Sequence, residues 1–121
     1  MMGYLTQDAL EAMGFAQLGK NVKISEKASI YEPEKMEIGD YSRIDDFCVV
    51  SGRVVMGRNV YVGPFTLIAG GLPGITFQDF TTLAYHVQVF SQSDDYRAPR
   101  FLTDFATMKQ VHQPVVGIGM G

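Results

Sequence analysis

The sequence predicts an all-β fold, a parallel β-helix of about four coils with a short helix covering its amino-terminal end. Three observations predict this fold. A large apolar residue recurs every six residues, a small or β-branched residue stands two positions before it, and both interruptions of the period fall at the same point of a three-unit cycle. Repeats of this length are typical of solenoids in which each unit is one short strand and one corner.

The central run of the repeat covers residues 38–68. Its large apolar residues are Ile38, Ile44, Val50, Met56, Val62 and Ile68. The small or β-branched residues two positions before the last five are Ser42, Cys48, Val54, Val60 and Thr66. Residues two apart on a strand share a face, so each unit directs one small and one large side chain inward. A helix would need apolar spacings of three and four, and hairpins would need two-residue turns; the run has neither.

The corners of the coils are predicted at the residue after each large apolar residue. These positions hold only glycine or short side chains: Gly39, Asp45, Ser51, Gly57, Gly63 and Ala69. Such residues tolerate unusual backbone angles, so we expect the chain to turn there.

The period extends in both directions to twelve units. The added large apolar residues are Leu18, Ile24, Ile30, Phe77, Leu83 and Val89. With three units per coil, the insertion at 31–34, the insertion within 70–74 and the break after Val89 all fall at one corner. Insertions in a solenoid collect on one face, which is often the binding face. The charged residues beside the first insertion (Glu32, Glu34, Lys35 and Glu37) are expected to form a solvated corner.

The amino-terminal segment predicts a short helix over residues 6–13. Thr6 is a suitable N-cap and Gly14 a suitable stop. We expect this helix to cover the open end of the first coil. The predicted organisation is a single domain, 1–121, with a helical cap (1–15), repeat coils (16–90), a long loop (91–117) and the start of a truncated further coil (118–121).

Composition and charge exclude several classes of function. The net charge of −3 disfavours nucleic acid and anionic membranes as partners, and no apolar run is long enough to span a membrane. The single cysteine, Cys48, excludes an intrachain disulfide framework and favours a reducing, cytoplasmic location. Because Cys48 occupies an inner repeat position, we expect a small buried hydrophobe rather than a nucleophile.

Several motifs make the chain similar to the hexapeptide-repeat acyltransferases, and closest to the galactoside and polysaccharide O-acetyltransferases among them. They are Gly19 to Ile24, Ile38-Gly39 followed by Arg43 to Phe47, Ser91 to Tyr96, and Pro114-Val115-Val116. The resemblance covers nearly the whole chain. It implies a left-handed coil, acetyl-CoA as acyl donor, and a sugar hydroxyl as acceptor in preference to an amine. Relatives continue for several coils beyond the segment 114–116, so the resemblance implies a shortened member.

The resemblance also implies a histidine acting as general base, which many relatives place where this chain has Asp94. An aspartate is a far weaker base unless its surroundings raise its pKa. The candidate catalytic residues are therefore His112 and Asp94, and the candidate substrate-binding residues are Asp95, Tyr96 and His86. His86 falls at a corner, where a polar residue simply meets solvent. Two histidines without a common spacing predict no metal site.

A second function stays open from the sequence, because relatives carry a sugar-binding asparagine that has no match near residues 63–65. This alternative is a shortened, catalytically inactive β-helix trimer with a binding or structural role. Both readings include self-association. Four outward positions are apolar or aromatic and predict a strip buried against another chain: Val49, Val55, Tyr61 and Leu67. The resemblance implies a homotrimer with active sites between the neighbouring prisms of different subunits.

Overall fold

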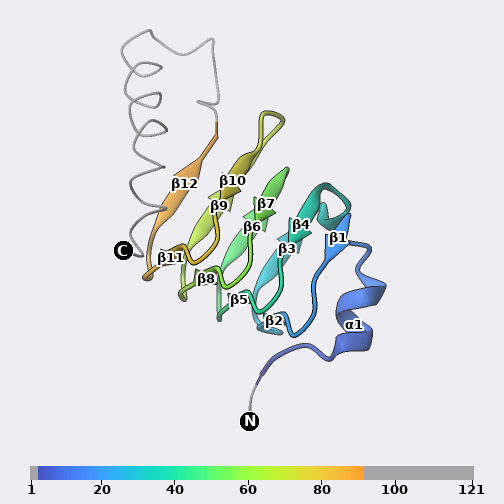
Figure 1. Cartoon of the computed structure of the whole chain (residues 1–121). Coiled ribbons are helices and arrows are strands. Elements are labelled where there is room, and N and C mark those ends of the chain that lie inside the picture. Colours follow the sequence, from blue (N-terminus) through green and yellow to red (C-terminus); the bar gives the residue numbers. More distant parts are fainter. Residues whose placement is uncertain (1–2, 92–121) are drawn as a thin grey trace, which may run out of the picture.

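The computed structural model describes residues 3–91 and shows a left-handed parallel β-helix of four coils (Figure 1). Three four-stranded parallel sheets form the sides of a triangular prism. Each coil contributes one strand to each side, as the sequence predicts. Within residues 3–91, no helix is long and apolar enough to cross a membrane.

The three faces are named here by their order along each coil. The first face consists of β1 (Gln17–Leu18), β4 (Met36–Ile38), β7 (Val54–Met56) and β10 (Ile75–Phe77). The second face consists of β2 (Lys23–Ile24), β5 (Arg43–Ile44), β8 (Tyr61–Val62) and β11 (Thr82–Leu83). The third face consists of β3 (Ser29–Tyr31), β6 (Val49–Ser51), β9 (Leu67–Ala69) and β12 (Gln88–Phe90).

The core is built from the residues of the six-residue period. Each of the twelve predicted large apolar residues lies in one of the twelve strands. On the second face, Ile24 pairs with Ile44, Ile44 with Val62, and Val62 with Leu83. This column is buried throughout. Burial of such side chains stabilises the fold by about 1.5–3 kcal/mol each, so the stacked columns supply the main stabilising term.

The corners differ from the prediction. The left-handed backbone angles occur three positions after the large apolar residue, not directly after it. The eight residues with this geometry at that position are Asn21, Tyr41, Phe47, Asn59, Phe65, Gly71, Phe80 and His86. The predicted unusual angle at the position after each large residue is therefore wrong.

The glycines after the large residues answer a different requirement, the close approach of neighbouring coils. A Cβ atom on Gly63 would lie 1.5 Å from the carbonyl oxygen of Ala84, and one on Gly39 would lie 2.3 Å from the carbonyl oxygen of Gly57. No side chain fits at these distances. Glycine is needed there for space rather than for backbone freedom.

The predicted helical cap is confirmed as α1 (Gln7–Ala12). The Thr6 hydroxyl accepts a hydrogen bond from the Ala9 amide at 3.1 Å, which satisfies one of the free amides of the first turn. Leu10 is fully buried within the core. Figure 1 shows α1 at the end of the prism that carries β1.

Both insertions join the third face to the first face, as predicted. The first contains a 3₁₀ turn, η1 (Pro33–Lys35), between β3 and β4, and the second is the segment 70–74 between β9 and β10. After β12 the chain reaches this same corner a third time. We refer to it as the insertion corner.

The predicted apolar strip does not exist as one surface. Val49 and Leu67 are register partners on the third face, but Val55 lies on the first face and Tyr61 on the second. The three-unit cycle predicts that Val49 and Leu67 stack on one face, and this pairing is confirmed; joining Val55 and Tyr61 to them in one strip was wrong. The third face is nevertheless distinctive, because its outward residues carry no charge: Ser29, Tyr31, Val49, Ser51, Leu67, Ala69, Gln88 and Phe90.

Candidate functional site

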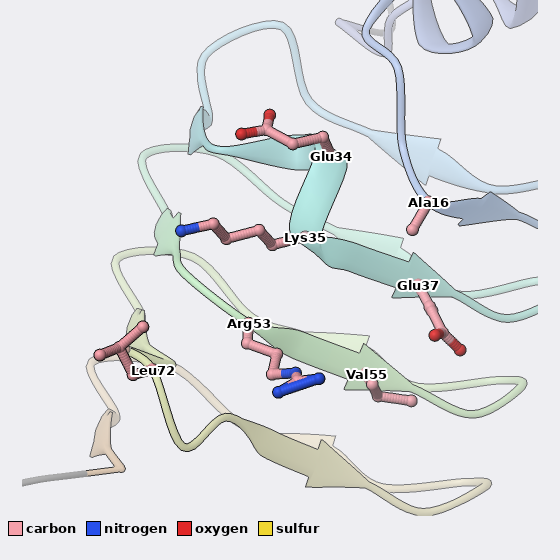
Figure 2. Close-up of a pocket in the computed structure, with 8 residues that line it drawn as sticks. Ala16, Glu34, Lys35, Glu37, Arg53, Val55 and Leu72 are labelled. Carbon is pink, nitrogen blue, oxygen red and sulfur yellow. The ribbon is translucent and has the colours of Figure 1, made fainter.

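A pocket of about 390 Å³ lies at the insertion corner, on the outer side of the first face (Figure 2). It is lined by Ala16, Glu34, Lys35, Glu37, Arg53, Val55, Gly71 and Leu72. The two insertions border it, and strands β4 and β7 form its floor. The two insertions gather at one corner, as the sequence predicts, and the pocket lies there; that this corner binds a ligand stays a prediction.

The two insertions determine which side chains reach the pocket. Glu32 adopts a left-handed backbone (φ 64°) that opens η1 and delivers Glu34 and Lys35. The segment 70–74 delivers Leu72. A Cβ atom on Gly74 would lie 2.8 Å from Cδ of Arg53, so the glycine leaves room for the arginine stem to lie against the loop.

Opposite charges occupy separate parts of the pocket. Lys35 forms an exposed ion pair with Glu32, Nζ to Oε2 at 3.3 Å. Among residues 3–91, Arg53 and Glu37 have no ion-pair partner. Arg53 directly precedes Val54, and Glu37 pairs with Val55. The pocket therefore offers a free guanidinium and a free carboxylate on neighbouring strands, an arrangement suited to a ligand carrying both an anion and a cation.

A second polar cluster lies on the second face, around Asp45. Its carboxylate accepts hydrogen bonds from the Tyr4 hydroxyl (3.0 Å) and the Tyr61 hydroxyl (2.7 Å). Arg43 adds an ion pair, Nε to Oδ1 at 3.1 Å, and lies over the Tyr61 ring at 4.5 Å. Partial burial and then the hydrogen bond to Asp45 raise the pKa of Tyr61. All carboxylate positions are used, so this cluster clamps the amino-terminal segment onto the prism rather than binding a ligand.

An aromatic column occupies the corner between the second and third faces. Phe47 stacks on Phe65 with ring centroids 5.2 Å apart, and Phe65 stacks on His86 at 5.1 Å. The corner position predicted for His86 is confirmed, but its ring does not simply meet solvent, because Phe65 covers one face. His86 lies at a different corner from the pocket, so the structure does not bring it to that site.

Cys48 behaves as predicted. It is 1% exposed, and its Sγ donates to the carbonyl oxygen of Gly63 at 3.0 Å. Burial raises the pKa of the thiol, which disfavours the reactive thiolate. A nucleophilic role is therefore excluded.

The remaining predicted site residues, Asp94, Asp95, Tyr96 and His112, lie outside the described residues. Sequence reasoning missed Arg53 and assigned Glu37 to a solvated corner. The sequence contained one signal for these residues. The charged cluster beside the first insertion lies at the corner where the insertions gather, so its side chains could have been predicted to line a pocket there. Within residues 3–91, no group of three or more metal-ligating side chains occurs.

Comparison with known proteins assigns the chain to a family. The profile "Bacterial transferase hexapeptide (six repeats)" matches residues 35–70. The dTDP-4-amino-4,6-dideoxy-D-glucose acyltransferase of Escherichia coli is 32% identical over 124 residues, covering 98% of this chain and 64% of that protein. The chain belongs to the hexapeptide-repeat transferases.

Solved structures of one enzyme, the N-acyltransferase AntD, are similar to this chain in both fold and sequence. The N-acyltransferase AntD from Bacillus cereus, in complex with dTDP and 3-hydroxybutyryl-CoA, matches with a TM-score of 0.77 and 36% identity, over 84% of this chain and 58% of AntD. A mutant of AntD in which one serine is replaced by alanine, in complex with dTDP-4-amino-4,6-dideoxyglucose and coenzyme A, matches with a TM-score of 0.77 and 42% identity. This match covers 79% of this chain and 52% of AntD. The chain thus spans less than two thirds of the relatives that it matches.

Proposed function

We propose that this chain belongs to an enzyme that transfers an acyl group from an acyl-CoA to the amino group of a nucleotide-linked amino sugar. The observation that carries the proposal is the 32% identity to an amino-sugar acyltransferase across 98% of the chain. The AntD complexes with dTDP and coenzyme A or its acyl ester support the same pair of substrates. The proposed acceptor differs from the sugar hydroxyl expected from the sequence, because the names of both relatives specify an amine or amino sugar.

The acceptor amine is an ammonium ion at neutral pH, so it must lose a proton beside the thioester before it can attack. The amine nitrogen attacks the carbonyl carbon, the C–N bond forms, the C–S bond breaks, and the coenzyme A sulfur leaves and takes up a proton. A general base that removes the amine proton contributes roughly 10²–10⁴-fold to the rate. His112 and Asp94 remain our candidates for this base. Acetyl as the acyl group and a cytoplasmic location also remain predictions.

We also propose a homotrimer assembled through the third face. The outward residues of this face carry no charge, and Val49 and Leu67 form an apolar pair at its centre. A flat, uncharged sheet surface flanked by half-exposed aromatic rings suits burial against a second copy. Active sites between neighbouring prisms would then lie beside the insertion corner.

The test is release of free thiol from acyl-CoA. Purified protein is mixed with dTDP-4-amino-4,6-dideoxyglucose and either acetyl-CoA or 3-hydroxybutyryl-CoA. Background from the protein is expected to be low, because Cys48 is buried. The matched control acceptor is dTDP-6-deoxyglucose, which carries a hydroxyl at the same carbon. Thiol release with the amine alone supports the proposal. Release with the hydroxyl alone would restore the O-acyltransferase reading, and no release from a stable trimer would favour the inactive, structural alternative.

A further inference from the structure

We infer that the pocket at the insertion corner binds the acceptor in one orientation, with Arg53 on its diphosphate and Glu37 on its ammonium group. This inference rests on the proposed function, since it takes a nucleotide-linked amino sugar as the ligand. It adds the residues that hold the acceptor and the reason that an amine is preferred to a hydroxyl.

Arg53 has the properties of an anion-binding residue. Its side chain is exposed in the pocket and forms no ion pair within residues 3–91. Its stem lies against Gly74, whose missing Cβ leaves the room for it. A guanidinium offers five donors in a planar fork that matches two phosphate oxygens at once. Lys35 is the other cation in the pocket, but Glu32 already engages it.

Glu37 stands at a suitable distance for the other end of the ligand. Its register partner is Val55, which lies two positions along β7 from Arg53. From the strand rise and the spacing between strands, the Cα atoms of Glu37 and Arg53 are roughly 8 Å apart. The 4-amino group and the glycosidic phosphate of the sugar project from opposite sides of one pyranose ring. Both residues line the pocket and neither has an ion-pair partner within residues 3–91, so side chains rising from these Cα positions leave room for one sugar ring between their charged ends.

Apolar side chains lie on both sides of Arg53. Figure 2 shows Val55 on the side of Glu37, and Leu72, from the second insertion, on the opposite side. Such side chains suit the methyl group of a 6-deoxy sugar better than a hydroxymethyl group. Figure 2 also shows Glu34 on the opposite side of Lys35 from Arg53, so Glu37 is the carboxylate nearer the proposed sugar position.

Isothermal titration of variants tests the assignment of Arg53. Arg53→Ala is expected to raise the Kd for dTDP about 10- to 100-fold and to leave the Kd for coenzyme A unchanged. Arg53→Lys keeps the positive charge but loses the planar guanidinium. Its Kd for dTDP is expected to lie between those of the wild-type protein and Arg53→Ala. The matched control is Arg58→Ala, because Arg58 is an exposed cation of the same prism whose partner is Asp79. Equal losses in both alanine variants, or a loss confined to coenzyme A, would overturn the inference.

Glu37 is tested by comparing two ligands on one protein. Wild-type protein is expected to bind dTDP-4-amino-4,6-dideoxyglucose about tenfold more tightly than dTDP-6-deoxyglucose. Glu37→Gln is expected to remove this difference, and the control Glu26→Gln to keep it. Persistence of the preference in Glu37→Gln would refute the role of that carboxylate.

The titrations and the thiol-release assay test the two proposals separately, so either proposal can be rejected without the other. Acyl transfer to the amino sugar with Arg53-independent binding would reject this inference and leave the proposed function intact. Arg53-dependent binding of dTDP without thiol release would support the acceptor site and reject the catalytic proposal.

Discussion

Phe65 and His86 lie face to face at one corner of the prism, with ring centroids 5.1 Å apart and an interplanar angle of 15°. Both residues have a left-handed backbone, with φ of 62° and 57°. This conformation costs a residue with a Cβ roughly 1–2 kcal/mol. Stacking along the column of Phe47, Phe65 and His86 offsets that cost, which explains why large rings occupy positions that ordinarily favour glycine or asparagine.

We predict that Phe65→Asn lowers stability by about 1–2 kcal/mol. Asparagine tolerates the left-handed backbone, so the substitution deletes two ring contacts without adding strain. The measurement is the urea midpoint of unfolding. The control is Phe80→Asn, at another left-handed corner, where the ring is half exposed and lies near Arg58. A loss no larger in Phe65→Asn than in Phe80→Asn would show that stacking is not the source of stability.

Thr66→Val is predicted to raise stability by roughly 1 kcal/mol. Thr66 is 1% exposed, and its hydroxyl has no hydrogen-bond partner among residues 3–91, so valine of similar shape removes an unsatisfied buried group. Ser42→Ala should have the opposite sign, because the Ser42 hydroxyl donates to the Gly57 carbonyl and accepts from the Val60 amide. Thermal unfolding of both variants provides the comparison, and a lower Tm in Thr66→Val would contradict this account.

The clamp around Asp45 predicts a loss of stability at alkaline pH. Partial burial and the hydrogen bond to Asp45 raise the folded-state pKa of Tyr4 and Tyr61 above the ordinary value of 10.0. Above that pH the unfolded chain releases its tyrosine protons while the folded chain keeps them. The contribution of these two tyrosines to stability therefore decreases from about pH 10 upward and is lost as pH passes their folded-state pKa.

Tyr61→Phe is expected to make this decrease shallower. Unfolding free energies measured between pH 8 and 11 would show the difference in slope. Tyr85→Phe is the control, since Tyr85 is an exposed tyrosine on the same prism outside the clamp. Identical slopes for wild-type protein and Tyr61→Phe would rule out the clamp as the origin.

Leu67→Glu is predicted to dissociate the proposed homotrimer, because an unpaired charge buried in an interface is costly. Light scattering at micromolar concentration should show the monomer mass. Thr76→Glu places the same charge on the first face and should leave the mass unchanged. If Leu67→Glu keeps the wild-type mass, the third face is not the interface.

For catalysis, His112→Ala is predicted to lower turnover roughly 10²–10⁴-fold, the contribution of a general base, with the far-ultraviolet circular dichroism unchanged. His86→Ala should be nearly silent in the same thiol-release assay, since His86 lies away from the insertion corner. Wild-type turnover in His112→Ala would transfer the role to Asp94, for which Asp94→Asn is the next variant.

Much of the fold follows from local pattern. The alternation of small and large apolar residues with a period of six requires strands of two or three residues separated by corners, so all twelve strands were predictable from residues such as Ile38 and Val62. The insertions revealed their common corner for the same reason, since three units make one coil.

Contacts between side chains of successive coils could not be predicted from the six-residue pattern. Phe47, Phe65 and His86 are separated by about one coil each, and whether their rings stack depends on backbone angles that no hydrophobic pattern encodes. The free guanidinium of Arg53 is a further example, because its isolation depends on Glu32 engaging Lys35 and on Gly74 admitting the arginine stem. The sequence by itself determined the coil and its core, since burial of apolar side chains follows a short period. Only the tertiary structure decided which charges meet in the pocket and which rings stack at the corner, because these contacts depend on backbone angles and side-chain positions that a six-residue period does not encode.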